Sequence, residues 1–268
     1  MNLLLLEPAE LAETGSGPFR IVLRDRRAEH VQRVLKGRPG QEIRVGVIGG
    51  GRGRGRIVSA SRGEVILDIE LDPPSPEPPR PETELFVGMP RPAVLHRVLQ
   101  HATTFGVSRI VLANAWRVEK SYFSSPSLEP EAIRRHLVLG AEQGLLTRLP
   151  EVVQERLFVP WLERVGAEPW PAGDGPPIRL LAHPGVETTV ELALEAAGVG
   201  AGRRRVQVAV GPEGGWIERE LETFRAAGFA PVSLGPWVLR VEAAVTAVLA
   251  QLEMARRLST AGDPRGPW

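Results

Sequence analysis

Two kinds of hydrophobic pattern divide the chain. Short runs of apolar, β-forming residues recur through the first seventy residues, at 19–24, 42–48, 56–60 and 64–71. These runs predict a small, mostly β module. His30, Val31, Val34 and Leu35 follow helical spacing between two of the runs, which predicts one short helix that ends at Gly37.

Beyond residue 83 the pattern changes. Short apolar segments typical of buried strands alternate with helical patterns, at 85–89, 109–113, 178–182, 206–210 and 231–234. This alternation predicts an α/β domain with a mainly parallel sheet. The last helical pattern carries a continuous apolar stripe of Val241, Ala244, Val245, Val248, Leu249 and Leu252. Such a stripe is typical of a core helix or of a subunit interface.

A proline-rich segment separates the two patterns. Residues 72–82 hold six prolines in eleven positions, which is typical of a stiff, extended linker. The predicted organisation is a small module at 1–72, a linker at 73–82, an α/β domain at 83–258 and a flexible tail at 259–268.

Composition excludes several classes of protein and of chemistry. The 268 residues are 43% hydrophobic and 24% charged, which is ordinary for a globular protein. The absence of cysteine excludes disulfides, thiolate nucleophiles and thiolate metal sites. The five histidines are scattered, so we expect no metal site. No apolar run reaches the roughly 18 residues of a membrane span, and the short run at 3–6 is no secretory signal, so we expect no membrane association and a cytoplasmic protein.

Positive charge is concentrated in the first module. Between residues 20 and 62 there are twelve basic residues against three acidic ones, an excess typical of a surface that binds nucleic acid, although a solvated charged face is the alternative. Glycines at 49–55 favour positive φ in a hairpin, and the arginines between them could follow a phosphate backbone. His30 could equally be a half-buried helix residue. The candidate RNA contacts are Arg24, His30, Arg33, Arg38, Arg52 and Arg54, joined by Arg117 and Lys120 from the α/β domain.

Three glycine-containing loops follow predicted strands of the α/β domain. They lie at 183–185, 211–215 and 235–240. In open parallel sheets, ligands bind at the carboxyl ends of the strands, where such loops expose backbone N–H groups. A phosphate loop is excluded because no lysine follows Lys120. Taken alone, the loop at 211–215 could also be an ordinary strand-to-helix turn.

At these positions the sequence resembles the RsmE branch of the SPOUT methyltransferases. The resemblance rests on Gly211-Pro212-Glu213-Gly214-Gly215, followed by Leu234-Gly235 and Leu239-Arg240-Val241-Glu242. Further matching motifs are His30 with Val34-Leu35, Phe105-Gly106-Val107, the block at 117–122, and Glu142-Gln143 with Thr147 and Leu149-Pro150. The motifs occur in family order through almost the whole chain.

The resemblance implies a PUA-like RNA-binding module followed by a SPOUT α/β domain with a C-terminal trefoil knot, an exception to the rule that chains avoid knots. It also implies a homodimer that uses S-adenosylmethionine to methylate N3 of a uridine, the family target m3U1498, in the 16S ribosomal RNA of the small ribosomal subunit. By position, the implied cofactor-binding residues are Leu181, Ala182, His183, Gly185, Gly211, Pro212, Glu213, Gly214, Gly215, Leu234, Gly235, Val238, Leu239 and Arg240.

Uracil N3 must lose a proton before or during methyl transfer, and the resulting charge spreads onto O2 and O4. We expect Arg240 to stabilise that charge. Glu213 or Glu242 is the candidate proton acceptor or orienting carboxylate. The alternatives are that Glu213 only meets a helix dipole and that Glu242 only braces its helix.

Three residues depart from the family pattern. Ala243 stands where the family has threonine, Trp237 where it commonly has arginine, and Trp216 where it has phenylalanine. Two other functions remain open: ribose 2′-O-methylation, although the asparagine-containing ending typical of those enzymes is missing, and RNA binding without catalysis during ribosome assembly.

Overall fold

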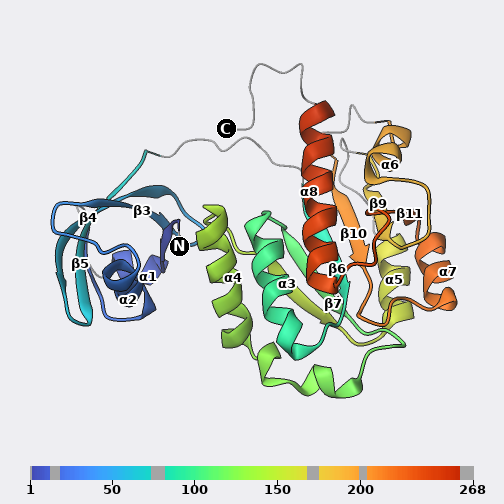
Figure 1. The fold of residues 1–268 in the computed structure, drawn as a ribbon, viewed down its shortest axis with the longest axis horizontal. Coiled ribbons are helices and arrows are strands. Elements are labelled where there is room, and N and C mark those ends of the chain that lie inside the picture. Colours follow the sequence, from blue (N-terminus) through green and yellow to red (C-terminus); the bar gives the residue numbers. More distant parts are fainter. Residues whose placement is uncertain (1, 13–18, 74–81, 168–174, 199–203, 260–268) are drawn as a thin grey trace. The chain divides into compact units, whose positions relative to one another are not determined.

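The computed structural model describes residues 2–12, 19–73, 82–167, 175–198 and 204–259 (Figure 1). Most of the predicted linker and nearly all of the predicted tail therefore lie outside the described residues. Contacts divide the chain into two compact units: Met1–Pro78 with Leu137–Leu149, and Pro79–His136 with Pro150–Trp268. The predicted domain limits did not separate 137–149 from the α/β domain. Among the described helices, none is long and apolar enough to cross a membrane.

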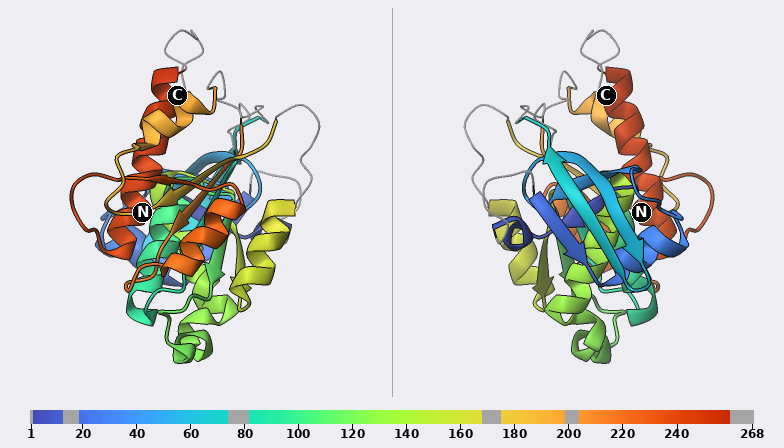
Figure 2. Two further views of the ribbon diagram at one scale, coloured as in Figure 1. Left: turned by 90° about the vertical axis from the view of Figure 1, so that its right-hand side faces the viewer. Right: turned by 90° about the vertical axis from the view of Figure 1, so that its left-hand side faces the viewer.

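The first unit is built on a curled five-stranded sheet. Its spatial order is β1 (Leu4–Leu6), β3 (Glu42–Val47), β4 (Arg52–Ser61), β5 (Glu64–Leu71) and β2 (Phe19–Leu23). Only β1 and β3 pair in parallel. Strand β1 was not predicted, because its three residues are fewer than the roughly four to eight of a typical strand. Figure 2 (right) shows the outer face of this sheet.

The glycine-rich stretch was only partly predicted correctly. Gly49 adopts a positive φ of 72° in the turn between β3 and β4, as expected. Gly53 and Gly55 instead lie within β4 and face the interior. A Cβ at Gly53 would lie 2.7 Å from Leu71 Cα, so these glycines allow close approach of neighbouring strands rather than a turn. The arginines between them consequently line the outer face.

Helix α2 (Arg26–Arg33) covers the inner face of this sheet. Asp25 caps it by accepting a hydrogen bond from Arg27 N, and Ala28 and Val31 enter the core. The predicted apolar face is wrong at its end, because the helix stops at Arg33 and leaves Val34 64% exposed. The short helix α1 (Pro8–Ala12) also belongs to this unit.

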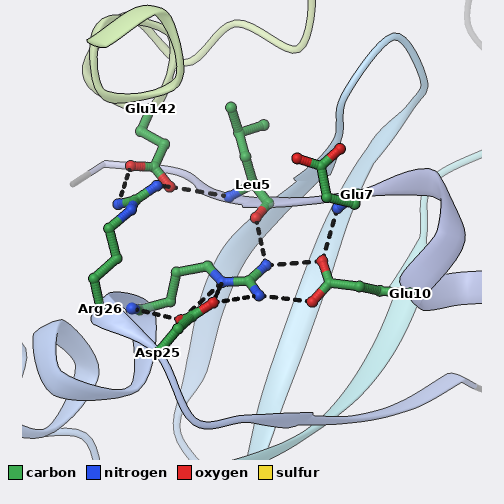
Figure 3. A network of polar contacts seen from close by, with 7 residues as sticks. Leu5, Glu7, Glu10, Asp25, Arg26 and Glu142 are labelled. Carbon is green, nitrogen blue, oxygen red and sulfur yellow. Dashed lines mark hydrogen bonds and ion pairs between the residues drawn. The ribbon is translucent and has the colours of Figure 1, made fainter. Parts of the chain in front are cut away.

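Arg27 is the enclosed centre of a polar network in the first unit, and its partners Leu5, Glu10 and Asp25 are labelled in Figure 3. Its guanidinium donates to both carboxylate oxygens of Glu10, at 2.6 and 2.9 Å, and to the carbonyl oxygen of Leu5 at 2.9 Å. It also pairs with Asp25 at 2.7 Å. Only 12% of its side chain is exposed. The network joins β1, α1 and the start of α2.

Glu142 connects the segment 137–149 to the rest of the first unit. Its carboxylate is 1% exposed and accepts two hydrogen bonds from Arg26, at 2.8 and 3.1 Å (Figure 3). Its carbonyl oxygen accepts from the N–H of Leu3 at 3.1 Å. Leu3 and Leu5 pack against Val138 and Ala141. The motif around Glu142 therefore has a structural role that the sequence alone did not reveal.

The second unit contains a six-stranded, all-parallel sheet. Its order is β11 (Ala230–Val232), β9 (Ile178–Ala182), β10 (Val206–Val210), β6 (Thr83–Gly88), β7 (Arg109–Ala113) and β8 (Glu151–Glu155). The predicted strands at 109–113, 178–182 and 206–210 are confirmed. Strand β8 was missed because only two of its five residues are apolar.

Helices cover both faces of this sheet (Figure 1). Helix α5 (Phe158–Ala167) and α7 (Glu218–Ala226) pack on one face through an aromatic cluster of Phe86, Trp161, Trp216, Phe224 and Phe229. Helices α3 (Pro92–Thr104), α6 (Val190–Ala196) and α8 (Val241–Ser259) lie together on the other. Helix α4 (Pro130–Gly144) follows two short 3₁₀ helices, Lys120–Ser124 and Pro126–Leu128.

The apolar stripe of α8 belongs to the core of this unit. Val241, Val245, Val248, Leu249 and Leu252 are each at most 4% exposed. Helix α8 packs mainly against α3 and α6. Of the two alternatives for the stripe, a core helix accounts for its buried residues within a single chain.

Candidate functional site

A cleft of about 860 Å³ lies at the carboxyl ends of β9 and β10 in the second unit. The three predicted loops meet there, because parallel strands bring their following loops to one edge of the sheet. The cleft is lined by predicted residues Arg117, Ala182, His183, Gly211, Pro212, Glu213, Gly214, Gly215, Leu234, Gly235, Val238, Leu239, Arg240 and Glu242. The three loops therefore meet at the edge of the sheet where the sequence predicted them, and they form the candidate site.

Three residues of the second unit that were predicted as site residues lie outside the cleft. Leu181 is fully buried in the core beneath α5 and α7, since it is inside β9 rather than after it. Gly185 lines a separate recess beside the cleft. Lys120 begins a 3₁₀ helix and does not line the cleft, although Arg117 does.

Glu213 links two loops of the cleft. Its Oε1 accepts a hydrogen bond of 3.0 Å from the N–H of Arg91, which immediately precedes α3. This places a carboxylate at the N-terminus of α3, where the helix dipole favours negative charge. The helix-dipole alternative for Glu213 is thus supported, with α3 as the helix rather than α7, which follows Glu213 in sequence.

Arg117 and Glu220 hold the loop at 211–217. The guanidinium of Arg117 donates to the carbonyl oxygen of Gly214 at 2.6 Å. The buried carboxylate of Glu220 accepts from the N–H groups of Trp116, at 2.8 Å, and Ile217, at 2.9 Å. The loops after β7 and β10 are therefore fastened to each other. The role of Glu220 was not predicted, because nothing in its spacing identifies Trp116 as a partner 104 positions away.

Glu242 and Arg240 differ in their contacts. Glu242, whose side chain is 15% exposed, pairs with Arg97 of α3 at 3.2 Å. Arg240 is exposed to the cleft, and its side chain makes no hydrogen bond or ion pair with any residue that the structure describes. Arg240 is consequently available to a ligand.

Arg91 and Arg97 line the cleft and were missed. Both come from the segment after β6, whose carboxyl end lies at the same edge of the sheet as those of β9 and β10. The strand-end argument, extended to the strand at 85–89, would have found Arg91. The cleft thus presents the guanidinium groups of Arg91, Arg97, Arg117 and Arg240 against two carboxylates, both of which already have partners.

Small residues shape the floor of the cleft. A Cβ at Gly214 would lie 2.9 Å from Arg117 Cβ, and one at Gly211 would lie 3.3 Å from Trp216 Nε1. Trp216 is 5% exposed, and its indole N–H has no hydrogen-bond partner within the described ranges. Bare backbone and an unpaired buried donor suit a polar organic ligand whose atoms approach the main chain closely.

The candidate RNA contacts of the first unit do not share one face. Arg52 and Arg54 lie on the outer face of the sheet, and Arg54 pairs with Glu42 at 3.4 Å. Arg33 lies on α2, which covers the inner face, and pairs with Glu29. Arg24 and Arg38 are both exposed, and Arg24 pairs with Glu64 at 2.6 Å.

His30 is half-buried on α2, and its Nε2 is buried without a partner among the described residues. Burial, with a contribution from the charge of Arg26, lowers the pKa of His30 despite the opposing carboxylate of Glu142. A neutral imidazole suits the alternative of a helix residue better than it suits a phosphate contact. No group of three or more potential metal ligands is found in the part of the chain described by the structure.

Two family models and several known proteins match this chain. Residues 76–253 match the model of an RNA methyltransferase domain, and residues 23–70 match an RNA methyltransferase PUA domain. The chain is 31% identical over 257 residues to ribosomal RNA small subunit methyltransferase E of Treponema pallidum, covering 93% of this chain and 90% of that protein. It is 26% identical to the Borreliella burgdorferi protein called ribosomal RNA small subunit methyltransferase E 1, covering 92% and 95%.

Solved structures show the same architecture. A ribosomal RNA small subunit methyltransferase E from Neisseria gonorrhoeae, bound to S-adenosylmethionine, superposes with a TM-score of 0.69 at 21% identity, covering 95% of this chain and 97% of that one. At this identity the likeness concerns the fold. Together with the matched domains, it confirms an α/β domain preceded by a PUA-like module.

Proposed function

This chain belongs to the family of ribosomal RNA small subunit methyltransferase E, and from that premise we propose that it transfers a methyl group from S-adenosylmethionine to N3 of a uridine in 16S ribosomal RNA. The resemblance drawn from the sequence motifs is thereby confirmed. One observation carries the proposal: the glycine loops after β9, β10 and β11 meet in a single cleft beside an unpaired Arg240.

The residues of the cleft suit S-adenosylmethionine. Backbone groups at 182–183, 211–215, 234–235 and 238–239 would hold it, because the glycines leave the main chain bare where a Cβ would intrude. When bound, this cofactor supplies an electrophilic methyl group on a sulfonium. The protein's principal task is then to orient the attacking nitrogen.

Arg240 has the features required for stabilising the uracil anion. Loss of the N3 proton leaves negative charge on O2 and O4, and a guanidinium can donate hydrogen bonds to either oxygen. Because the Arg240 side chain has no partner among the described residues, it need not break an existing contact to do so. Such donors are most effective where water is excluded.

The two carboxylates suit different tasks. The pairing with Arg97 makes Glu242 an orienting group that holds the start of α8 against α3. Glu213 is exposed and uses Oε1 for Arg91, and no contact of its Oε2 is present among the described residues. We assign proton acceptance at N3 to Glu213.

RNA binding is assigned to the outer face of the first sheet and to Arg117 at the cleft. Strand β4 places Arg52, Arg54 and Arg56 on that face, and Arg44 lies opposite Arg54 in the neighbouring strand. Arginine contacts to phosphates position a nucleic acid without selecting its sequence. The choice of uridine would then be made in the cleft.

Substitution of Arg240 tests the assignment. Arg240→Ala is expected to lower kcat at least about 100-fold, the effect of removing one charge-stabilising donor, while the affinity for S-adenosylmethionine changes little. Arg219→Ala, an exposed arginine of α7 outside the cleft, is the control. Near-normal turnover in Arg240→Ala would contradict the assignment. Nuclease digestion and mass spectrometry of the methylated RNA show whether the methyl group is on N3 of uracil or on a ribose 2′-oxygen.

Four further properties stay predictions. These are the trefoil knot, the homodimer, the cytoplasmic location and the particular uridine that is modified. Light scattering of the full chain tests the homodimer. Incubation of unmethylated small subunits and of naked 16S ribosomal RNA with labelled cofactor shows which of the two is the substrate and where the methyl group is added.

A further inference from the structure

Trp237 is unusually exposed for its residue type. Its side chain is 72% exposed, in the loop between β11 and α8. Tryptophan is the largest side chain with apolar character, and exposure of this extent leaves most of its surface in water. Val238, next to it in the loop, is 86% exposed. An exposed aromatic ring beside a functional cleft therefore calls for an explanation in terms of a ligand.

The ring has a defined support. Gly235 adopts a φ of 124°, and a Cβ there would lie 3.3 Å from Cε3 of Trp237. The glycine consequently lets the edge of the indole pack on the main chain. Trp237 also lines two hollows at once: the main cleft and a recess of about 410 Å³ that includes Gly185 and Ser233. Pro184, Gly235 and Val238 also line both hollows.

The surroundings are cationic. Arg240 and Arg117 line the main cleft without any unpartnered carboxylate beside them among the described residues. Guanidinium groups next to an exposed aromatic ring match the two parts of a single-stranded nucleic acid, its phosphates and the faces of its bases. On this basis we infer that Trp237 is a stacking surface for a base of the substrate RNA next to the target uridine. This inference rests on the proposed function.

The position of Trp237 favours an RNA base over the adenine of the cofactor. The residues assigned to the cofactor are backbone groups lined by glycine, whereas Trp237 presents a side chain that is mostly open to solvent. An RNA strand with one nucleotide in the cleft must have its next nucleotide at the edge of the cleft. The recess beyond Trp237 offers a place for that neighbour.

Kinetics of the full-length protein test the inference, with unmethylated small ribosomal subunits as substrate. Trp237→Leu is expected to raise KM for the subunits by about 5- to 150-fold, the range given by removal of one base–aromatic stack. KM for S-adenosylmethionine should change less than about twofold, and Trp237→Phe should restore most of the loss, because a smaller ring still stacks. Trp116→Leu is the matched control, since Trp116 is 80% exposed and lies outside both hollows.

Three results would overturn the inference. Trp237→Leu could behave like Trp116→Leu, it could raise KM for the cofactor instead, or it could change the oligomeric state in light scattering. In each case an active wild-type protein leaves the proposed function standing. If the wild type methylates neither subunits nor naked ribosomal RNA, the proposed function fails, and the inference fails with it.

Discussion

Arginines dominate both the first unit and the cleft of the second, but their partners differ. In the first unit Arg26 and Arg27 donate to carboxylates in buried or half-buried places. In the cleft, Arg240 has no partner among the described residues, and Arg117 bonds a backbone carbonyl group. A count of charges along a sequence therefore mixes cations that stabilise the fold with cations that are available to a ligand. Only the contacts separate the two groups.

The largest expected effect comes from removing the most enclosed arginine of the first unit. Arg27→Met leaves Glu10 without its ion-pair partner and the carbonyl group of Leu5 without a donor, so the free energy of unfolding should fall by roughly 3 kcal/mol or more. Arg24→Met is the control, because Arg24 is 73% exposed in its pair with Glu64, and exposed pairs contribute at most about 1 kcal/mol.

The measurement must report on the first unit. All six tryptophans and the single tyrosine lie outside residues 1–78 and 137–149, so intrinsic fluorescence follows the second unit. Hydrogen exchange of the amides in β2–β5 reports on the first. Equal losses in Arg27→Met and Arg24→Met would show that burial of the network does not matter.

The cleft, in contrast, depends on small residues. Gly88 ends β6, and a Cβ there would lie 2.7 Å from the backbone N of Pro212, so Gly88→Ala must displace the loop at 211–215. We expect destabilisation by about 1–3 kcal/mol together with weaker binding of S-adenosylmethionine, measured by calorimetry. Gly51→Ala is the control because a Cβ there meets nothing within 4 Å. Unchanged cofactor affinity in Gly88→Ala would separate this loop from the cofactor site.

Charge reversal distinguishes the outer face of the first unit's sheet from the face that α2 covers. The double variant Arg52→Glu and Arg54→Glu should weaken RNA binding and reduce its salt dependence by about 0.7 to 0.9 in logarithmic slope per lost phosphate contact. Arg33→Glu, on the helix covering the other face of the sheet, should leave the slope unchanged. Filter binding of RNA at a series of salt concentrations measures the slope for each variant. Equal slopes in the wild type and the double variant would show that the outer face of the sheet does not bind RNA.

The sequence predicted the second unit better than the first. Strands at 109–113, 178–182 and 206–210 are continuous apolar runs in a sheet covered on both faces, and such runs are visible in any window. Strands β1 and β8 are edge strands of their sheets. Strand β1 is apolar and buried but only three residues long, and β8 has only two apolar residues. The end of α2 at Arg33 depends on backbone contacts, such as the bond from Gly37 N to Val31 O, that periodicity does not reveal.

The site was predictable where it follows from topology and unpredictable where it depends on pairing. The loops after β9, β10 and β11 converge because all parallel strands end at one edge. The bond between Glu213 and Arg91 joins positions 122 residues apart, and no local pattern encodes it. The same holds for Glu142 and Arg26, 116 residues apart, whose motif was recognised without its structural role.

The smallest expected effect is on pH dependence, and its acid component should appear in the first unit. Burial by itself would raise the pKa of Glu10 and of Asp25, but hydrogen bonds from Arg27 and its charge outweigh burial, so both pKa values lie below their usual range. Between the usual and the lowered values the unfolded chain binds more protons than the folded one, so stability falls as pH drops below about 4. The lowered pKa of His30 adds a loss in the same direction that begins near pH 6.5. Hydrogen exchange of β2–β5 from pH 7 to 3, corrected for intrinsic rates, should therefore show an acid component that is reduced in Arg27→Met and a component near pH 6.5 that is absent in His30→Gln. Burial also lowers the pKa of His136 in the second unit, so β6, β9 and β10 should share a component near pH 6.5 but lack the acid component. An equal loss of protection below about pH 4 in both units, or an unaltered acid component in Arg27→Met, would mean that the carboxylates around Arg27 do not govern the acid response of the first unit.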